Sequence, residues 1–144
     1  SAPPAAPGTP SLTVSGSAVG TKQILYQEAV DETVFPNFST ELTARVMGIP
    51  LVEPVAEAID GVSTIASPVE GNLPDGGTAG LFQFVGAEHE FLLKSDEPSL
   101  MRAGQLQAAI FLSTWLRTGT GVIVDPFDAA QVAPYDPGNL PWTL

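Results

Sequence analysis

Hydrophobic and polar residues alternate over short stretches in the first half of the chain, a pattern typical of β-strands with one buried face. Residues 12–34 suit short strands, and the apolar residues 24–26 follow a Gly-Thr turn signal at 20–21. Residues 62–70 alternate weakly and predict a further strand. Residues 41–47 fit either a helical turn or a strand. The pattern therefore predicts several short strands and does not decide between helix and strand at 41–47.

A turn sequence in the middle of the chain precedes an aromatic-rich region. Residues 73–77 read Leu-Pro-Asp-Gly-Gly, which places proline and glycine where turn geometry requires them. The aromatic-rich run 79–85 follows, and a Gly-Ala break separates it from a second run with an aromatic residue at 88–93. Two such runs around a glycine break predict a β-hairpin.

The strongest helical pattern covers residues 99–117. Ser99 can cap the start of this helix, and Gly119 can end it. Apolar residues, among them Leu112 and Trp115, occupy most of the amphipathic pattern. The polar side chains fall on one stripe, which comprises Arg102, Gln105, Ser113 and Arg117, with Ala109 filling a gap. Gly104 disfavours a helix by about 1 kcal/mol relative to alanine, so a long strand is the alternative.

Both ends of the chain are rich in proline. The first ten residues contain four prolines and no charged side chain, which favours polyproline II or disorder. No repeat and no internal linker divides the remainder. The sequence therefore predicts a β-rich α+β fold with short strands and one helix at about 99–117. Its parts are an extended N-terminal arm at 1–12, a compact β-rich body at 13–132 and a proline-rich tail at 133–144.

Composition and charge restrict the classes of partner. Hydrophobic residues make up 44% of the chain and charged residues only 15%, a depletion of charge that is typical of protein interfaces. The net charge is −11 and the five basic residues are scattered singly, so we expect neither direct nucleic-acid binding nor attraction to anionic membranes. The longest apolar run is too short to span a bilayer. A start at Ser1 without a signal-peptide pattern leads us to expect synthesis in the cytoplasm.

Residues that could carry chemistry are few. The chain has no cysteine, and its one histidine, His89, lies between two glutamates in a predicted strand, where alternation would turn both carboxylates away from the imidazole. No serine has the surroundings of a nucleophilic triad. A carboxylate pair drawn from distant positions stays open, and Glu53, Glu57 and Asp60 fit one face of a short helix. We therefore expect that the protein is not an enzyme and has neither a metal site nor a cofactor.

Several large apolar residues, some of them near the C-terminus, could contact other chains. Trp142 and Leu144 are costly to leave in water, so they either pack back on the domain or enter a partner. Phe35, Phe38 and Tyr135 fit either the core, which is the preferred interpretation, or a contact between subunits.

The segment Asp75-Gly76-Gly77-Thr78-Ala79-Gly80-Leu81 resembles the Asp-Gly turn and following small-residue strand of the capsid decoration proteins of tailed bacteriophages. Small size, absent cysteine and a Pro- and Ala-rich N-terminal arm are similar as well. The Pro-Tyr-Asp-Pro sequence at 134–137 is similar to a segment of some relatives, although there it precedes the turn. The resemblance implies trimers on local threefold positions of a capsid, with the arm adding a strand to a capsid-protein sheet.

These observations predict a structural virion protein made in a host cytoplasm, namely a capsid decoration subunit on the capsid surface. Its expected partners are itself, as a homotrimer, and a major capsid or other shell protein. The alternatives are another homopolymeric subunit, of a tail tube, pilus or surface layer, and a soluble binding or adhesion module. The residues predicted to bind partners are Pro3, Pro4, Pro7, Pro10, Leu12, Tyr135, Trp142 and Leu144.

Overall fold

The computed structural model describes residues 21–30, 37–93 and 96–135. Its elements, in chain order, are β1 (Gln23–Ala29), α1 (Phe38–Met47), β2 (Leu51–Val52), β3 (Thr64–Ile65), β4 (Val69–Glu70), β5 (Thr78–Phe84), α2 (Pro98–Thr118), β6 (Val122–Ile123), α3 (Ala129–Val132) and the 3-10 helix η1 (Ala133–Tyr135). The predicted compact domain of short strands and helices is confirmed, and α2 coincides with the helix expected at about 99–117. The open segment at 41–47 is helical, as part of α1.

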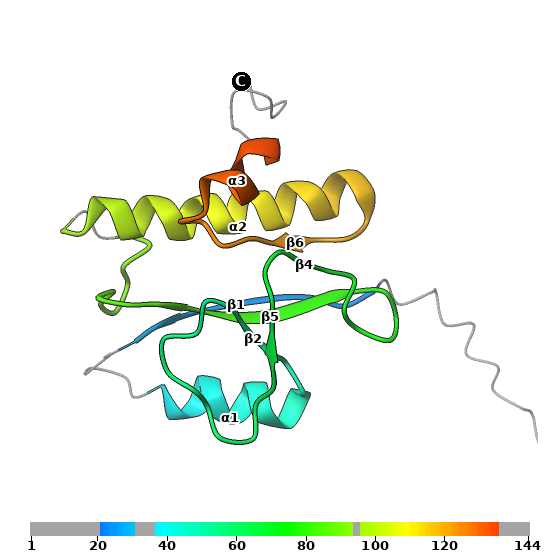
Figure 1. The fold of residues 1–144 in the computed structure, drawn as a ribbon, viewed down its shortest axis with the longest axis horizontal. Coiled ribbons are helices and arrows are strands. Elements are labelled where there is room, and N and C mark those ends of the chain that lie inside the picture. The colour runs from blue at the N-terminus through cyan, green and yellow to red at the C-terminus, as the bar shows by residue number, and fades with distance from the viewer. Residues whose placement is uncertain (1–20, 31–36, 94–95, 136–144) are drawn as a thin grey trace, which may run out of the picture.

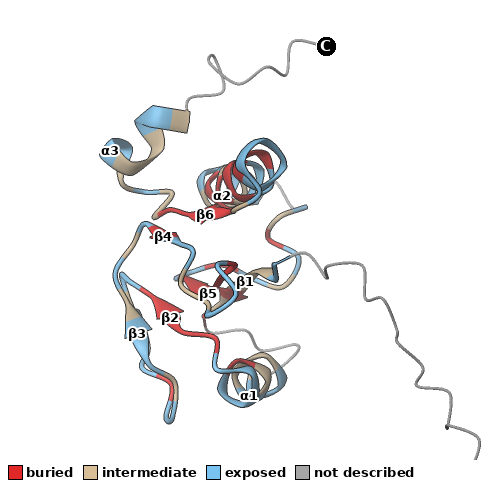
Figure 2. Ribbon diagram, turned by 90° about the vertical axis from the view of Figure 1, so that its right-hand side faces the viewer, coloured by how far each residue is buried: buried red, intermediate tan, exposed pale blue. Residues whose placement is uncertain are grey.

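A four-stranded sheet in the order β1-β5-β2-β3 forms the middle layer, and all its pairings are parallel. Helix α1 covers one face of this sheet, and α2 lies on the other side (Figures 1 and 2). The two-stranded antiparallel sheet of β4 and β6 lies between the main sheet and α2. This layered arrangement makes the domain α/β.

The central strand β5 is buried along its whole length, which explains its composition. All seven of its residues are buried, because elements cover both faces of the sheet. Ala79 and Leu81 pack toward α1, whereas Phe82 and Phe84 join the core on the α2 side. A Cβ at Gly80 would lie 2.5 Å from Cγ2 of Val52, so glycine allows the layers to approach closely. The strand therefore divides the interior into two cores.

The predicted hairpin at 79–93 is wrong. The first run forms β5, but β5 pairs in parallel with β1 and β2. The second run forms consecutive turns at 89–93, and Phe91 is buried from these turns rather than from a strand. Continuous burial on both faces, not pairing of neighbouring runs, is the reason for the apolar character of the first run.

Three further local predictions are also corrected. The stretch 62–70 contains two short strands in different sheets, β3 and β4, with Pro68 between them. Residues 53–60 form an irregular loop, so no helical face groups the carboxylates of that segment. Helix α2 starts earlier than expected: Glu97 is its N-cap residue and Pro98 occupies the first turn, while Gly119 ends it at a φ of 84°, as predicted.

Candidate interaction surfaces and a polar pocket

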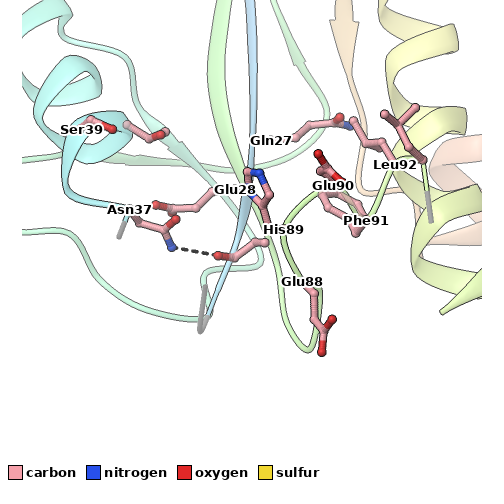
Figure 3. Close-up of a pocket in the computed structure, with 12 residues that line it drawn as sticks. Gln27, Glu28, Asn37, Ser39, Glu88, His89, Glu90, Phe91 and Leu92 are labelled. Atoms are coloured by element: carbon pink, nitrogen blue, oxygen red, sulfur yellow. Dashed lines mark hydrogen bonds between the residues drawn. The ribbon is translucent and has the colours of Figure 1, made fainter. Parts of the chain in front are cut away.

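A pocket of about 470 Å³ opens beside the carboxyl end of β1. Its walls come from the last residues of β1, from the first turn of α1 and from the turns at 88–93 (Figure 3). Strands of a parallel sheet end at one edge, and ligand sites of α/β folds lie preferentially at that edge. The lining residues that carry polar side chains are Gln27, Glu28, Asn37, Ser39, Thr40, Glu88, His89 and Glu90.

Glu28 is the buried acidic group of this pocket, with only 3% of its surface exposed. Its Oε2 accepts a hydrogen bond of 3.1 Å from Nε2 of Gln83. Gln83 is fixed in turn, because its Oε1 accepts hydrogen bonds from the backbone N–H groups of Ala56 and Glu57 at 3.1 and 3.0 Å. Oε1 of Glu28 has no hydrogen-bond partner among the described residues. The pocket therefore contains a carboxyl group that is held in place but only half satisfied.

The pKa of Glu28 is raised above its ordinary value. Burial, which disfavours the charged form, is the main cause, and the negative charges of Glu41 and Glu57 add to it. The hydrogen bond from Gln83 acts in the opposite direction but is the weaker influence. The native state thus holds the proton of Glu28 more tightly than the unfolded chain does. Its stabilising contribution is complete below the unfolded pKa and is lost as pH rises through the folded pKa.

Glu28→Gln should therefore make the protein more stable than wild type at about pH 8 and flatten the decline in stability between about pH 4 and that value. Glutamine keeps an acceptor for Gln83 and removes the buried charge. Urea denaturation at a series of pH values measures the effect, with the exposed Glu90→Gln as the control. An unchanged pH dependence in Glu28→Gln would contradict this assignment.

His89 lies in a turn and is half-buried, not in a strand as predicted. It lines the same pocket as Glu28, so folding brings the two together. No group of three or more His, Cys, Asp or Glu residues within the described ranges could hold a metal ion. Among the carboxylates considered in the sequence, Glu57 is exposed and acts on this site through its charge.

Helix α1 exposes an apolar ridge. Phe38, Leu42 and Val46 are spaced four residues apart and therefore follow one another along the outer face of the helix. Phe38 is 67% exposed and Val46 is 76% exposed, so the preferred core position of Phe38 is wrong. Ala44 is the residue of α1 that is buried against the sheet. We call Phe38, Leu42 and Val46 the α1 stripe.

Helix α2 exposes a second apolar group, formed by Leu112, Trp115 and Leu116 and called the α2 stripe below. Leu116 is 69% exposed, and the other two side chains are 49% and 41% exposed. The predicted polar stripe is partly wrong, because Ser113 is buried. The outer surfaces of both helices appear as exposed positions in Figure 2.

Buried polar side chains explain how α2 is oriented. Gln107 is fully buried, donates a hydrogen bond of 2.7 Å to the carbonyl oxygen of Val124 and accepts one of 2.9 Å from Gln27. Oγ1 of Thr114 accepts a hydrogen bond of 2.9 Å from the backbone N–H of Val122. These bonds satisfy polar groups that would otherwise be costly to bury. They hold Gln107 and Thr114 inward beside the apolar residues of the buried face, and Leu112, Trp115 and Leu116 stay outside.

The partner-binding roles predicted for eight residues all stay predictions. Tyr135 is half-buried in η1 and packs against a core cluster that contains Ile110 and Val124. Its partner-binding role stays a prediction. Seven residues lie outside the described part of the chain: Pro3, Pro4, Pro7, Pro10, Leu12, Trp142 and Leu144. The sequence analysis missed both stripes, although the i, i+4, i+8 spacing of the α1 stripe was a visible signal.

No helix within the described ranges is long and apolar enough to cross a membrane. Comparison with known proteins adds no relative, because no protein-family model, no curated protein and no solved structure matches this chain.

Proposed function

We propose that this protein is a structural subunit that works by binding other protein chains in an assembly. One observation carries the proposal: two helices on opposite sides of the sheet each expose an apolar stripe. Contiguous apolar groups on a protein surface are typical of interaction sites. Both stripes contain an aromatic residue, and aromatic side chains are enriched in interface cores.

The composition of the chain supports the same function. Only 15% of the residues are charged, and the net charge is −11. Repulsion between copies keeps such a chain soluble, while a surface with few charges loses little solvation when it is covered. In this function the chain carries out no catalytic step and needs no cofactor, and its partners are proteins rather than nucleic acid or membrane.

The specific form that we propose is a capsid decoration subunit, present as a homotrimer on the outer surface of a virion. The support is the resemblance of residues 75–81 to decoration proteins, together with the turn and strand that these residues form. The backbone N–H of Gly76 donates to the carbonyl oxygen of Leu73 at 2.9 Å, and β5 follows directly. The proline-rich arm at 1–12 would supply the contact with a shell protein.

A second form, a homopolymeric subunit of a tube or filament, is favoured by the position of the stripes. Two different surfaces on opposite sides of a subunit suit contacts that repeat from copy to copy. Such contacts close into a ring or continue as a filament, depending on the rotation between neighbours.

Fractionation of the native source on a density gradient tests the proposed function, with mass spectrometry to locate the chain. We expect co-migration with a large particle at a copy number comparable to that of the main shell or filament protein. Recovery only among slowly sedimenting soluble proteins would overturn the proposal in both forms.

A further inference from the structure

We propose that the two stripes bind each other between copies of this chain, so that α2 of one copy packs against α1 of the next. This inference rests on the proposed assembly function and identifies the partner of both surfaces as a second copy. The stripes lie on opposite sides of the sheet, so they cannot meet within one chain (Figures 1 and 2). Pairing of like stripes would need two different contacts to cover both surfaces, whereas unlike pairing covers both with a single kind of contact.

The shapes of the two stripes suit each other. Phe38, Leu42 and Val46 form a ridge along i±4 positions of α1, and Leu112 and Leu116 form an i±4 ridge on α2. Ridges of this kind interdigitate in the commonest class of helix packing, in which the axes cross at about −50°. Trp115, beside the α2 ridge, supplies an aromatic side chain of the type that dominates binding energy.

Helix α2 is a positively charged element in an acidic protein. It contains Arg102 and Arg117 and no acidic residue over 21 residues, and both arginines are exposed. Pairing of α2 with α2 would therefore bring together the two copies of Arg117, the residue after Leu116, and repulsion between these like charges disfavours that arrangement.

The layer that contains α1 is acidic. Glu41 lies in the first turn of α1, and Glu57 and Asp60 are exposed in the loop after β2. Arg45 is the one basic residue of α1, and its Nε already donates a hydrogen bond of 2.7 Å to the carbonyl oxygen of Asp60. Pairing of α1 with α1 would thus add to the repulsion between copies, whereas pairing of α1 with α2 joins opposite charges.

Two variants, each with one stripe blocked, test this contact in the full chain. The α1 variant is Phe38→Glu with Val46→Glu, and the α2 variant is Leu112→Glu with Leu116→Glu. All four positions are exposed, so circular dichroism and thermal unfolding should match wild type closely. Val85→Glu, at another exposed apolar position outside both stripes, is the matched control. Sedimentation velocity and light scattering over a range of concentrations report the oligomeric state.

We expect wild type and the Val85→Glu control to form oligomers as concentration rises. Each stripe variant alone should stay monomeric at concentrations at least about tenfold above the wild-type midpoint. Their equimolar mixture should form a one-to-one heterodimer and nothing larger, because each variant retains one complementary stripe.

A dimer of either stripe variant alone would show pairing of like stripes and overturn the proposal. A wild-type chain that stays monomeric at every concentration would overturn it too. In that case, co-migration with a native particle would still uphold the assembly function, with a different chain as the partner.

Discussion

Replacing Phe84 with alanine should lower the free energy of unfolding by about 3–5 kcal/mol. Phe84 is the last residue of β5 and is fully buried. Its ring centroid lies 5.1 Å from that of Phe82, 4.9 Å from that of Phe91 and 5.9 Å from that of Phe127. The substitution removes three aromatic contacts and leaves a cavity between the sheet, the turns at 88–93 and the segment after β6.

Urea denaturation monitored by circular dichroism measures this loss. Val85→Ala, at the next position in the chain, is the control, because Val85 is 60% exposed and should change stability by no more than about 0.5 kcal/mol. A loss below about 1 kcal/mol for Phe84→Ala would show that the aromatic cluster does not form a tightly packed core around β5.

Gly77→Ala should destabilise the protein by about 3 kcal/mol, because the new methyl group meets backbone atoms. A Cβ at Gly77 would lie 2.0 Å from the carbonyl oxygen of Lys22, at the start of the β1–β5 pairing. The backbone N–H groups of Gly77 and Lys22 also donate hydrogen bonds to the carboxylate of Asp75, at 2.8 and 3.1 Å. These two bonds hold the pKa of Asp75 below its ordinary value. Moving the backbone would therefore disturb both the turn and the edge of the sheet.

Gly76→Ala, one residue earlier in the same turn, distinguishes the steric clash of an added methyl group from the strain of a positive φ. Gly76 has a φ of 81° and no atom within 4 Å of an added Cβ, so this substitution adds only backbone strain of about 1 kcal/mol. Thermal and urea unfolding of the two variants compares the effects. Equal losses at both positions would contradict the close approach of Gly77 to Lys22.

The turn at 73–77 and helix α2 were correctly predicted, because each depends on local sequence preferences with a direct physical cause. The turn at 73–77 depends on the preferences of proline, aspartate and glycine for turn conformations, and these act within a few residues. The position of α2 follows from its length and helical periodicity, even though Gly104 argued against it. That glycine has a packing reason: a Cβ there would lie 2.5 Å from Cδ2 of Leu92 and 2.8 Å from Cε2 of Phe91.

Strand pairing could not be predicted, because it depends on contacts between distant segments. The sequence of β5 reads equally well as one arm of a hairpin and as the central strand of a parallel sheet. The second interpretation required knowing that β1, more than fifty positions earlier, pairs along its entire length. The prediction of a single strand at 62–70 was wrong for a related reason, because β3 pairs with β2 and β4 pairs with β6, in different sheets.

The pocket and the stripes were not predicted because several polar side chains are buried and several apolar side chains are exposed, contrary to the usual preference. Gln107 and Ser113 are polar but buried, and each is satisfied by hydrogen bonds. Leu112 and Trp115 are apolar but exposed. Likewise, nothing in the sequence indicated that Glu28, a single acidic residue in a strand, would line a pocket. Its role emerges only when Gln83 and the turn that contains His89 fold around it.

Hydroxyl-radical labelling of the assembled and the isolated protein tests most directly whether the two stripes are covered in the assembly, with mass spectrometry to locate the modified side chains. The particle fraction from the native source supplies the assembled form. We expect labelling of both stripes, at Phe38, Leu42, Trp115 and Leu116, to fall several-fold on assembly, while labelling of Val85 stays the same. Stripes that are labelled equally in the two forms would contradict the claim that these helices bind the neighbouring chain.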